Sequence, residues 1–78
     1  MALRDSTLKK YMIVYRSYLN VIKQLGATAN HVSKDHLYEL AGESLGYKLK
    51  TSGLIVRKIL KMPEGERKKM LADFEMEE

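Results

Sequence analysis

Apolar residues are spaced along the first third of the chain with the period of an α-helix. They recur every three or four positions from residue 8 to residue 25, which predicts a helix over residues 6–25. Asp5 or Ser6 can cap its start, and Gly26 can end it in a left-handed conformation. Ile13 falls on the otherwise polar side of this helix. The apolar positions are Leu8, Tyr11, Met12, Tyr15, Tyr18, Leu19, Ile22 and Leu25.

Three shorter helices are predicted further along, over residues 34–45, 51–62 and 64–75. Ser33 can cap the first of them and Gly46 can end it, while Thr51 or Ser52 can cap the next. No alternating pattern typical of a β-strand is present in the sequence. We therefore expect an all-α fold, a small bundle of three to four helices that forms a single domain over residues 1–78.

The composition argues against several classes of protein. Cysteine is absent, so the chain can form neither disulfides nor a cysteine zinc site. No apolar run approaches the roughly 18 residues that span a membrane. His31 and His36 lie five residues apart across a helix start, a spacing that matches none of the usual zinc patterns. We expect a cytoplasmic protein that is not an enzyme and has no metal ion, no cofactor and no membrane partner.

Charge is distributed unevenly along the chain. Residues 1–62 hold eleven Lys and Arg against four Asp and Glu, whereas residues 63–78 hold three against six. The predicted helix over residues 51–62 has an apolar side and an opposite side that is basic, without an acidic residue. Such a helix is typical of a surface that binds an anionic partner, with nucleic acid the leading candidate. The alternative is an ordinary solvated surface.

Residues 33–60 resemble a helix-turn-helix DNA-binding unit. In that family a small residue lies midway along the first helix and a glycine follows four positions later in the turn, as Gly42 and Gly46 do here. A buried aliphatic residue usually stands six positions after the turn glycine, where this chain has Ser52. This departure predicts a turn two to four residues longer than the compact form. No strand pair follows Met62, so we expect no wing.

The resemblance implies a small protein that binds double-stranded DNA, with the helix over residues 51–62 in the major groove as the recognition helix. It would be a dimeric transcriptional regulator or an accessory factor of a mobile element. Leu54 lies among the basic residues, where it either touches a thymine methyl group or packs as a core residue under the fourth helix. The candidate DNA-binding residues are Lys48, Lys50, Thr51, Ser52, Arg57, Lys58 and Lys61.

The first helix carries an aromatic stripe that predicts either core packing or a face for self-association. A chain of this length builds only a small core, so a homodimer is a reasonable expectation. The candidate partner or dimer face consists of Tyr11, Ile13, Tyr15 and Tyr18. The alternative function is a helical protein–protein interaction module that does not bind nucleic acid. Such a module would depend on this face or on Leu54 instead of the basic residues.

Overall fold

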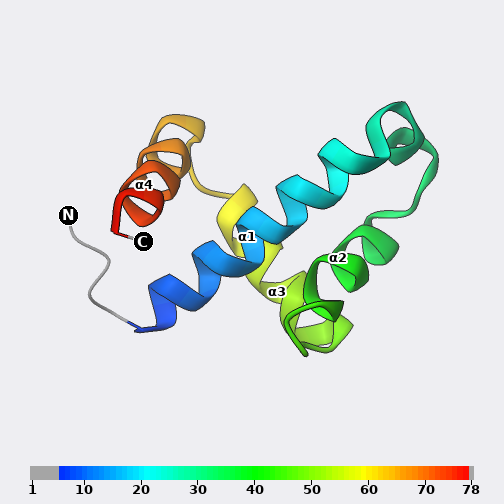
Figure 1. Ribbon diagram of the computed structural model, residues 1–78, viewed down its shortest axis with the longest axis horizontal. Helices are drawn as coiled ribbons and strands as arrows, with labels where there is room; N and C mark the ends of the chain where they lie inside the picture. The colour runs from blue at the N-terminus through cyan, green and yellow to red at the C-terminus, as the bar shows by residue number, and fades with distance from the viewer. Residues whose placement is uncertain (1–5, 78) are drawn as a thin grey trace.

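Helix α1 (Ser6–Leu25) runs diagonally across the molecule, and the other helices pack against it (Figure 1). The structure is a computed structural model that describes residues 6–77. A 3-10 helix, Gly26–His31, occupies most of the segment that follows α1. The remaining elements are α2 (Lys34–Glu43), α3 (Leu49–Leu60) and α4 (Glu64–Glu77). Residues 6–77 contain no strand, which confirms the predicted all-α fold and small helical bundle.

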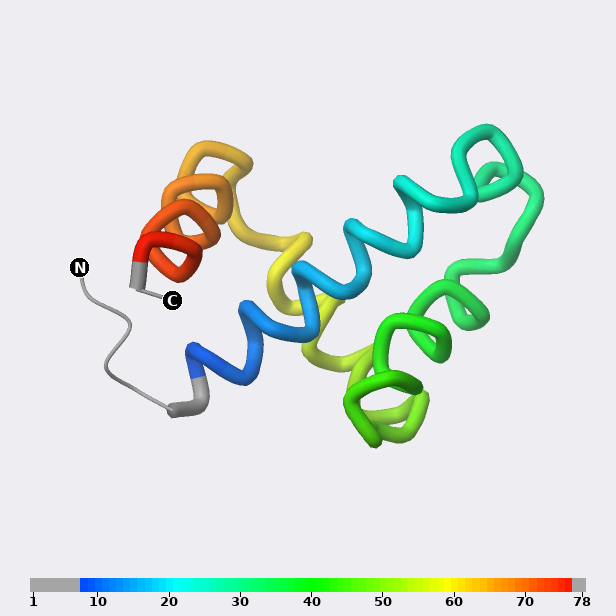
Figure 2. The backbone as a smooth tube through the Cα atoms, in the orientation of Figure 1, coloured from blue at the N-terminus to red at the C-terminus, as the bar shows by residue number. Residues whose placement is uncertain are grey.

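The core lies where α1, α2 and α3 meet, and α4 adds one aromatic ring to it. Helices α2 and α4 lie toward opposite ends of the molecule, with α3 crossing α1 between them (Figure 2). The ring of Tyr18 on α1 lies 6.5 Å from the ring of Tyr15 and 5.7 Å from that of Tyr38 on α2. The buried apolar residues are Met12, Val14, Tyr15, Tyr18, Leu37, Tyr38, Ala41, Ile55, Val56, Ile59 and Phe74.

The start of α2 and the ends of α1 and α2 follow the predicted chemistry. The Ser33 hydroxyl accepts a hydrogen bond from the His36 amide at 3.2 Å, so the predicted cap is confirmed. Gly26 and Gly46 have positive φ angles of 58° and 78°, as expected for glycines that end helices. The cap predicted for α1 at Asp5 or Ser6 rests on Asp5, which lies outside the described residues, or on the Ser6 side chain, of which nothing is described.

The turn after α2 is closed by a pair of backbone hydrogen bonds. The Tyr47 amide donates to the Gly42 carbonyl oxygen at 2.9 Å, and the Gly46 amide donates to the Glu43 carbonyl oxygen at 3.2 Å. With Gly46 in the left-handed region, this is the Schellman arrangement, which satisfies carbonyl groups that the helix leaves without partners. The direction in which the chain leaves α2 is therefore determined by hydrogen bonds.

Helix α3 begins at Leu49, two residues before the predicted start at residue 51, and ends at Leu60. The prediction that Thr51 or Ser52 caps this helix is wrong, because the capping position is Lys48, whose side chain makes no capping hydrogen bond. Ser52 lies inside the first turn of the helix, and its hydroxyl donates to the Tyr38 carbonyl oxygen on α2.

Helices α2 and α3 approach closely because small residues line their contact. A Cβ atom added to Gly42 would lie 2.8 Å from the Ser52 Cβ and 3.0 Å from the Tyr47 carbonyl oxygen. A Cβ atom added to Gly53 on α3 would lie 3.3 Å from the Tyr38 Cδ2 atom. The crossing of these two helices therefore depends on the absence of a side chain at Gly42.

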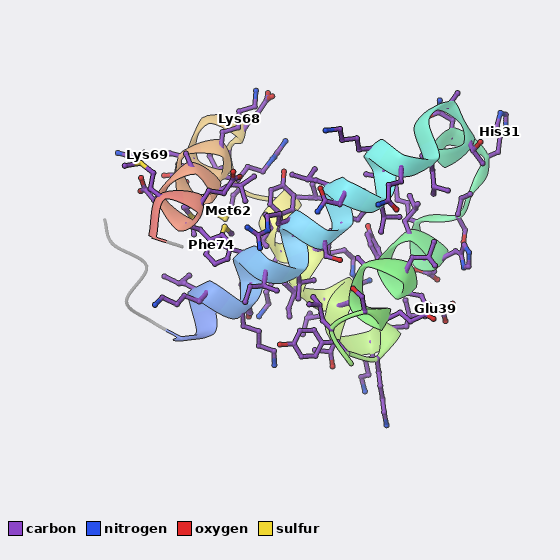
Figure 3. All side chains as sticks on the ribbon, viewed as in Figure 1. His31, Glu39, Met62, Lys68, Lys69 and Phe74 are labelled. Carbon is purple, nitrogen blue, oxygen red and sulfur yellow. The ribbon has the colours of Figure 1, made fainter. Side chains whose placement is uncertain are left out.

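Helix α4 docks on α1 through an aromatic ring. The Arg16 guanidinium lies 5.1 Å from the centre of the Phe74 ring, and Phe74 is buried on the side of α4 that faces α1 (Figure 3). The Arg67 Nη1 atom donates to the Met62 carbonyl oxygen at 3.0 Å, which ties the start of α4 to the end of the preceding segment. The helix runs to Glu77, past the predicted end at residue 75.

We expect Gly42→Ala to lower the free energy of unfolding by about 1–3 kcal/mol, because the added methyl group overpacks the α2–α3 contact. The matched control is Gly65→Ala in α4, where an added Cβ meets nothing within 4 Å. That change should be neutral or stabilise by up to about 1 kcal/mol. Urea unfolding followed by circular dichroism measures both, and equal stabilities of the two variants would contradict the close contact.

Candidate nucleic-acid interface

One side of α3 is buried and the opposite side is exposed and basic. In a regular helix the Cα atoms of Lys50, Arg57 and Lys61 fall within about 40° of one another around the axis. All three side chains are exposed, as is that of Lys58 beside them. The buried side carries Ser52, Gly53, Ile55, Val56 and Ile59. The structure thus brings Lys50, Arg57, Lys58 and Lys61 together on one side of this helix. We call these four residues, with the exposed Lys48 at the capping position just before the helix, the basic face.

No described carboxylate forms an ion pair with a cation of the basic face. Helix α4 differs in this respect, because the Lys68 Nζ atom lies 3.0 Å from the Glu64 Oε1 atom. The hydrogen bond from Lys68, with the charges of Lys68 and Arg67, lowers the pKa of the exposed Glu64 carboxyl. On α3 the Arg57 Nε atom donates to the Gly53 carbonyl oxygen at 3.2 Å, which orients the guanidinium along the helix.

Two predicted contact residues are not on the exposed surface of this face. Ser52 is fully buried, and its hydroxyl donates to the Tyr38 carbonyl oxygen at 2.7 Å. The prediction that its side chain contacts DNA is therefore wrong, because its hydroxyl lies inside the α2–α3 contact. Thr51 is half-buried, and because α3 begins at Leu49 it lies within the first turn instead of at the cap.

A longer turn between α2 and α3 was predicted because Ser52 stands where a buried aliphatic residue is usual, and the burial of Ser52 removes that reason. The residue six positions after Gly46 does occupy the core position, although it is a serine instead of an aliphatic residue. Its small size matches the missing side chain of Gly42, and its hydrogen bond satisfies the buried hydroxyl. Helix α3 consequently begins only three residues after Gly46.

Leu54 is 48% exposed, so the alternative in which it packs as a core residue under the fourth helix is wrong. It lies on the same side of α3 as the basic face, four residues after Lys50 and three before Arg57. Leu60, predicted on the buried side, is 36% exposed and lies at its edge.

The predicted partner face on α1 is mostly used within the chain. Tyr15 and Tyr18 are buried in the core, and burial together with the neighbouring Tyr38 and Tyr15 raises the pKa of the Tyr18 hydroxyl. Tyr11 and Ile13 are half-buried and pack against the same core. Only these two residues retain exposed surface that a second chain could cover.

Lys10 of α1 is a basic residue that the sequence reasoning did not connect with α3. Its Nζ atom lies 4.8 Å from the centre of the Tyr47 ring, so it stands beside the turn that leads into α3. No signal in the sequence links these two positions, because the contact arises only when α1 packs across α2 and α3. Lys10 therefore adds positive charge near Lys48.

A second feature that the sequence did not indicate is an open groove between α1 and α2, of about 410 Å³. On one side of it the Ser17 hydroxyl donates to the Ala41 carbonyl oxygen at 2.7 Å, which ties the two helices together. The groove is lined by Ser17, Asn20, Val21, Gln24, Leu25, Leu40 and Ser44. Its lining carries no charged group and no obvious catalytic side chain.

Residues 6–77 hold no cluster of three or more His, Asp or Glu side chains that could bind a metal ion. His31 and His36 are both exposed, and the His36 Nδ1 atom lies 3.5 Å from the Glu39 Oε1 atom. His31, in the 3-10 helix, lies apart from Glu39 on α2 (Figure 3). In the same part of the chain, no helix has both the length and the apolar character needed to cross a membrane.

No protein-family model matches the chain, and neither the curated proteins nor the solved structures contain a match to it. The geometry of the basic face is therefore the observation from which a function can be proposed.

We expect Ser52→Ala to lower the free energy of unfolding by about 1 kcal/mol, because it removes a buried hydrogen bond to the Tyr38 carbonyl oxygen. The folded variant should bind any ligand of the basic face as the wild type does. Chemical denaturation gives the stability, and a binding titration at a temperature where both proteins are folded gives the affinity. A variant of unchanged stability that binds more weakly would instead show that the Ser52 side chain contacts the ligand.

Proposed function

We propose that the protein binds double-stranded DNA, with α3 as the recognition helix in the major groove. The observation that carries this proposal is the basic face of α3, whose cations have no ion-pair partner among the described carboxylates. The cations of such a face attract DNA phosphates whatever the base sequence, and an α-helix fits the width of the major groove. An anionic partner would supply the counter-charges that the described carboxylates do not.

The packing of α3 against α2 also supports the proposal. A recognition helix must be held at a defined angle if its side chains are to reach base edges in register. The contact between Gly42 and Ser52 and the hydrogen-bonded turn at Gly46 hold α3 on α2. These are also the positions on which the resemblance to a helix-turn-helix unit depends.

The roles within the basic face follow from side-chain chemistry. Arg57 lies in the second half of α3, and its remaining guanidinium donors can pair with a guanine edge or with phosphate. Lys50 is near the start of the helix and can contact a phosphate or a base edge. Lys48, Lys58 and Lys61 neutralise backbone charge, and Lys10 extends the same surface from α1.

The competing function is a protein–protein interaction module, and the groove between α1 and α2 is the observation that favours it. An amphipathic segment of a partner could bury apolar atoms against Val21, Leu25 and Leu40 there. Such binding would depend little on salt, whereas neutralisation of four phosphates predicts a slope of about −3.6 in a plot of log affinity against log salt concentration.

We further propose that the DNA-binding form is a homodimer, as expected of a transcriptional regulator or a mobile-element factor that reads two half-sites. Two copies would place two α3 helices on one side of the duplex. The surface left for this contact is the exposed part of Tyr11 and Ile13, because Tyr15 and Tyr18 belong to the core.

We expect the double change Lys50→Glu and Arg57→Glu to reduce DNA affinity at least a hundred-fold, because it replaces two attractive phosphate or base contacts by repulsion. The matched control is Lys23→Glu with Lys69→Glu, which alters net charge equally at exposed positions on α1 and α4. Fluorescence anisotropy with a labelled mixed-sequence duplex measures both.

The control double variant should bind within a few-fold of wild type. Equal losses in the two variants would mean that DNA is attracted only by net charge, and the proposed role of α3 would be wrong. Circular dichroism establishes that each variant is folded.

For the dimer, we expect sedimentation equilibrium to give a mass near twice that of the 9.0 kDa chain, and Ile13→Glu to shift the population to monomer. The introduced charge would be buried without a partner in the dimer contact. A wild-type protein that stays monomeric both alone and on DNA would disprove the homodimer and leave the role of α3 intact.

A further inference from the structure

An apolar side chain lies within the basic face of α3. Leu54 is 48% exposed, and its neighbours one helical turn away are Lys50 and Thr51 on one side and Arg57 and Lys58 on the other. The other exposed leucines of this helix, Leu49 and Leu60, lie toward its buried side, away from these cations. Leu54 is therefore the apolar contact point of the basic face.

The cations around Leu54 select the kind of partner that can cover it. An apolar protein surface placed over Leu54 would also desolvate the neighbouring lysines and arginine without supplying counter-charges, which is strongly unfavourable. A DNA duplex differs because its phosphates pair with those cations at the two edges of the groove. The base edges on the groove floor then face Leu54.

Among those base edges, one chemical group matches a leucine side chain. The C5-methyl group of thymine is the apolar group that a standard base pair presents in the major groove, and the other groups there are hydrogen-bond donors or acceptors. Leucine can neither donate nor accept a hydrogen bond, so it gains nothing from them.

We infer that Leu54 determines a preference for thymine at the position in the bound site that it faces, through contact with the C5-methyl group. This inference rests on the proposed DNA binding by α3. It assigns specificity to an apolar residue, while the surrounding cations supply affinity that is independent of sequence.

The test compares two short AT-rich duplexes of the same sequence, one with thymine and one with deoxyuridine throughout. Deoxyuridine pairs as thymine does and lacks only the methyl group. Wild type should bind the thymine duplex about four-fold more tightly for each methyl group that Leu54 covers, the factor expected for one buried carbon. Fluorescence anisotropy at about 50 mM salt keeps both complexes measurable.

Leu54→Gln should bind the two duplexes equally, because the adenines that glutamine can hydrogen-bond are the same in both. Leu60→Gln is the matched control, because it removes a leucine of the same helix that is 36% exposed but lies away from the basic face, and it should keep the preference. Both variants keep a helix-forming side chain at an exposed position.

The outcomes separate the inference from the proposed function. Equal binding of both duplexes by wild type, with the expected salt dependence, overturns the role of Leu54 and leaves DNA binding by α3 in place. A preference that survives in Leu54→Gln also overturns that role. The absence of binding to either duplex overturns both.

Discussion

The contact between Gly42 of α2 and Ser52 of α3 sets how closely these two helices pack. A Cβ atom at Gly42 would come within 2.8 Å of the Ser52 Cβ, so the two helices can cross at this distance only with glycine there. The serine hydroxyl then has no access to water, and its hydrogen bond to the Tyr38 carbonyl oxygen satisfies it. Packing and hydrogen bonding therefore hold α3 in one position relative to α2.

The surface of the molecule follows from that position. With Ser52, Ile55 and Ile59 turned into the core, the helical period places Lys50, Arg57 and Lys61 on the opposite, exposed side. The hydrogen-bonded turn at Gly46 sets the direction of entry into α3, and α1 brings Lys10 beside that turn. The fixed position of α3 and the exposure of its basic face therefore arise from the same contact.

The period of apolar residues was enough to locate the helices and to predict which side of α3 carries charge. Helix α1 has the predicted bounds, and Gly26 and Gly46 end helices as expected. The surface position expected for Ser52 is wrong, and of the two positions left open for Leu54 the structure excludes the core. A serine is buried where glycine on a neighbouring helix leaves room only for a small side chain, and a leucine is exposed where no helix covers it. Both depend on contacts between helices, which the period of one helix does not contain.

DNA binding by the basic face of α3 can be tested by titrating the isotope-labelled protein with a mixed-sequence duplex. Backbone amide chemical shifts are followed at low and at higher salt. We expect salt-sensitive shifts confined to the segment from Lys48 to Lys61, with Lys69 on α4 unaffected. Shifts spread evenly over every lysine, or no shifts at all, would contradict binding by this face.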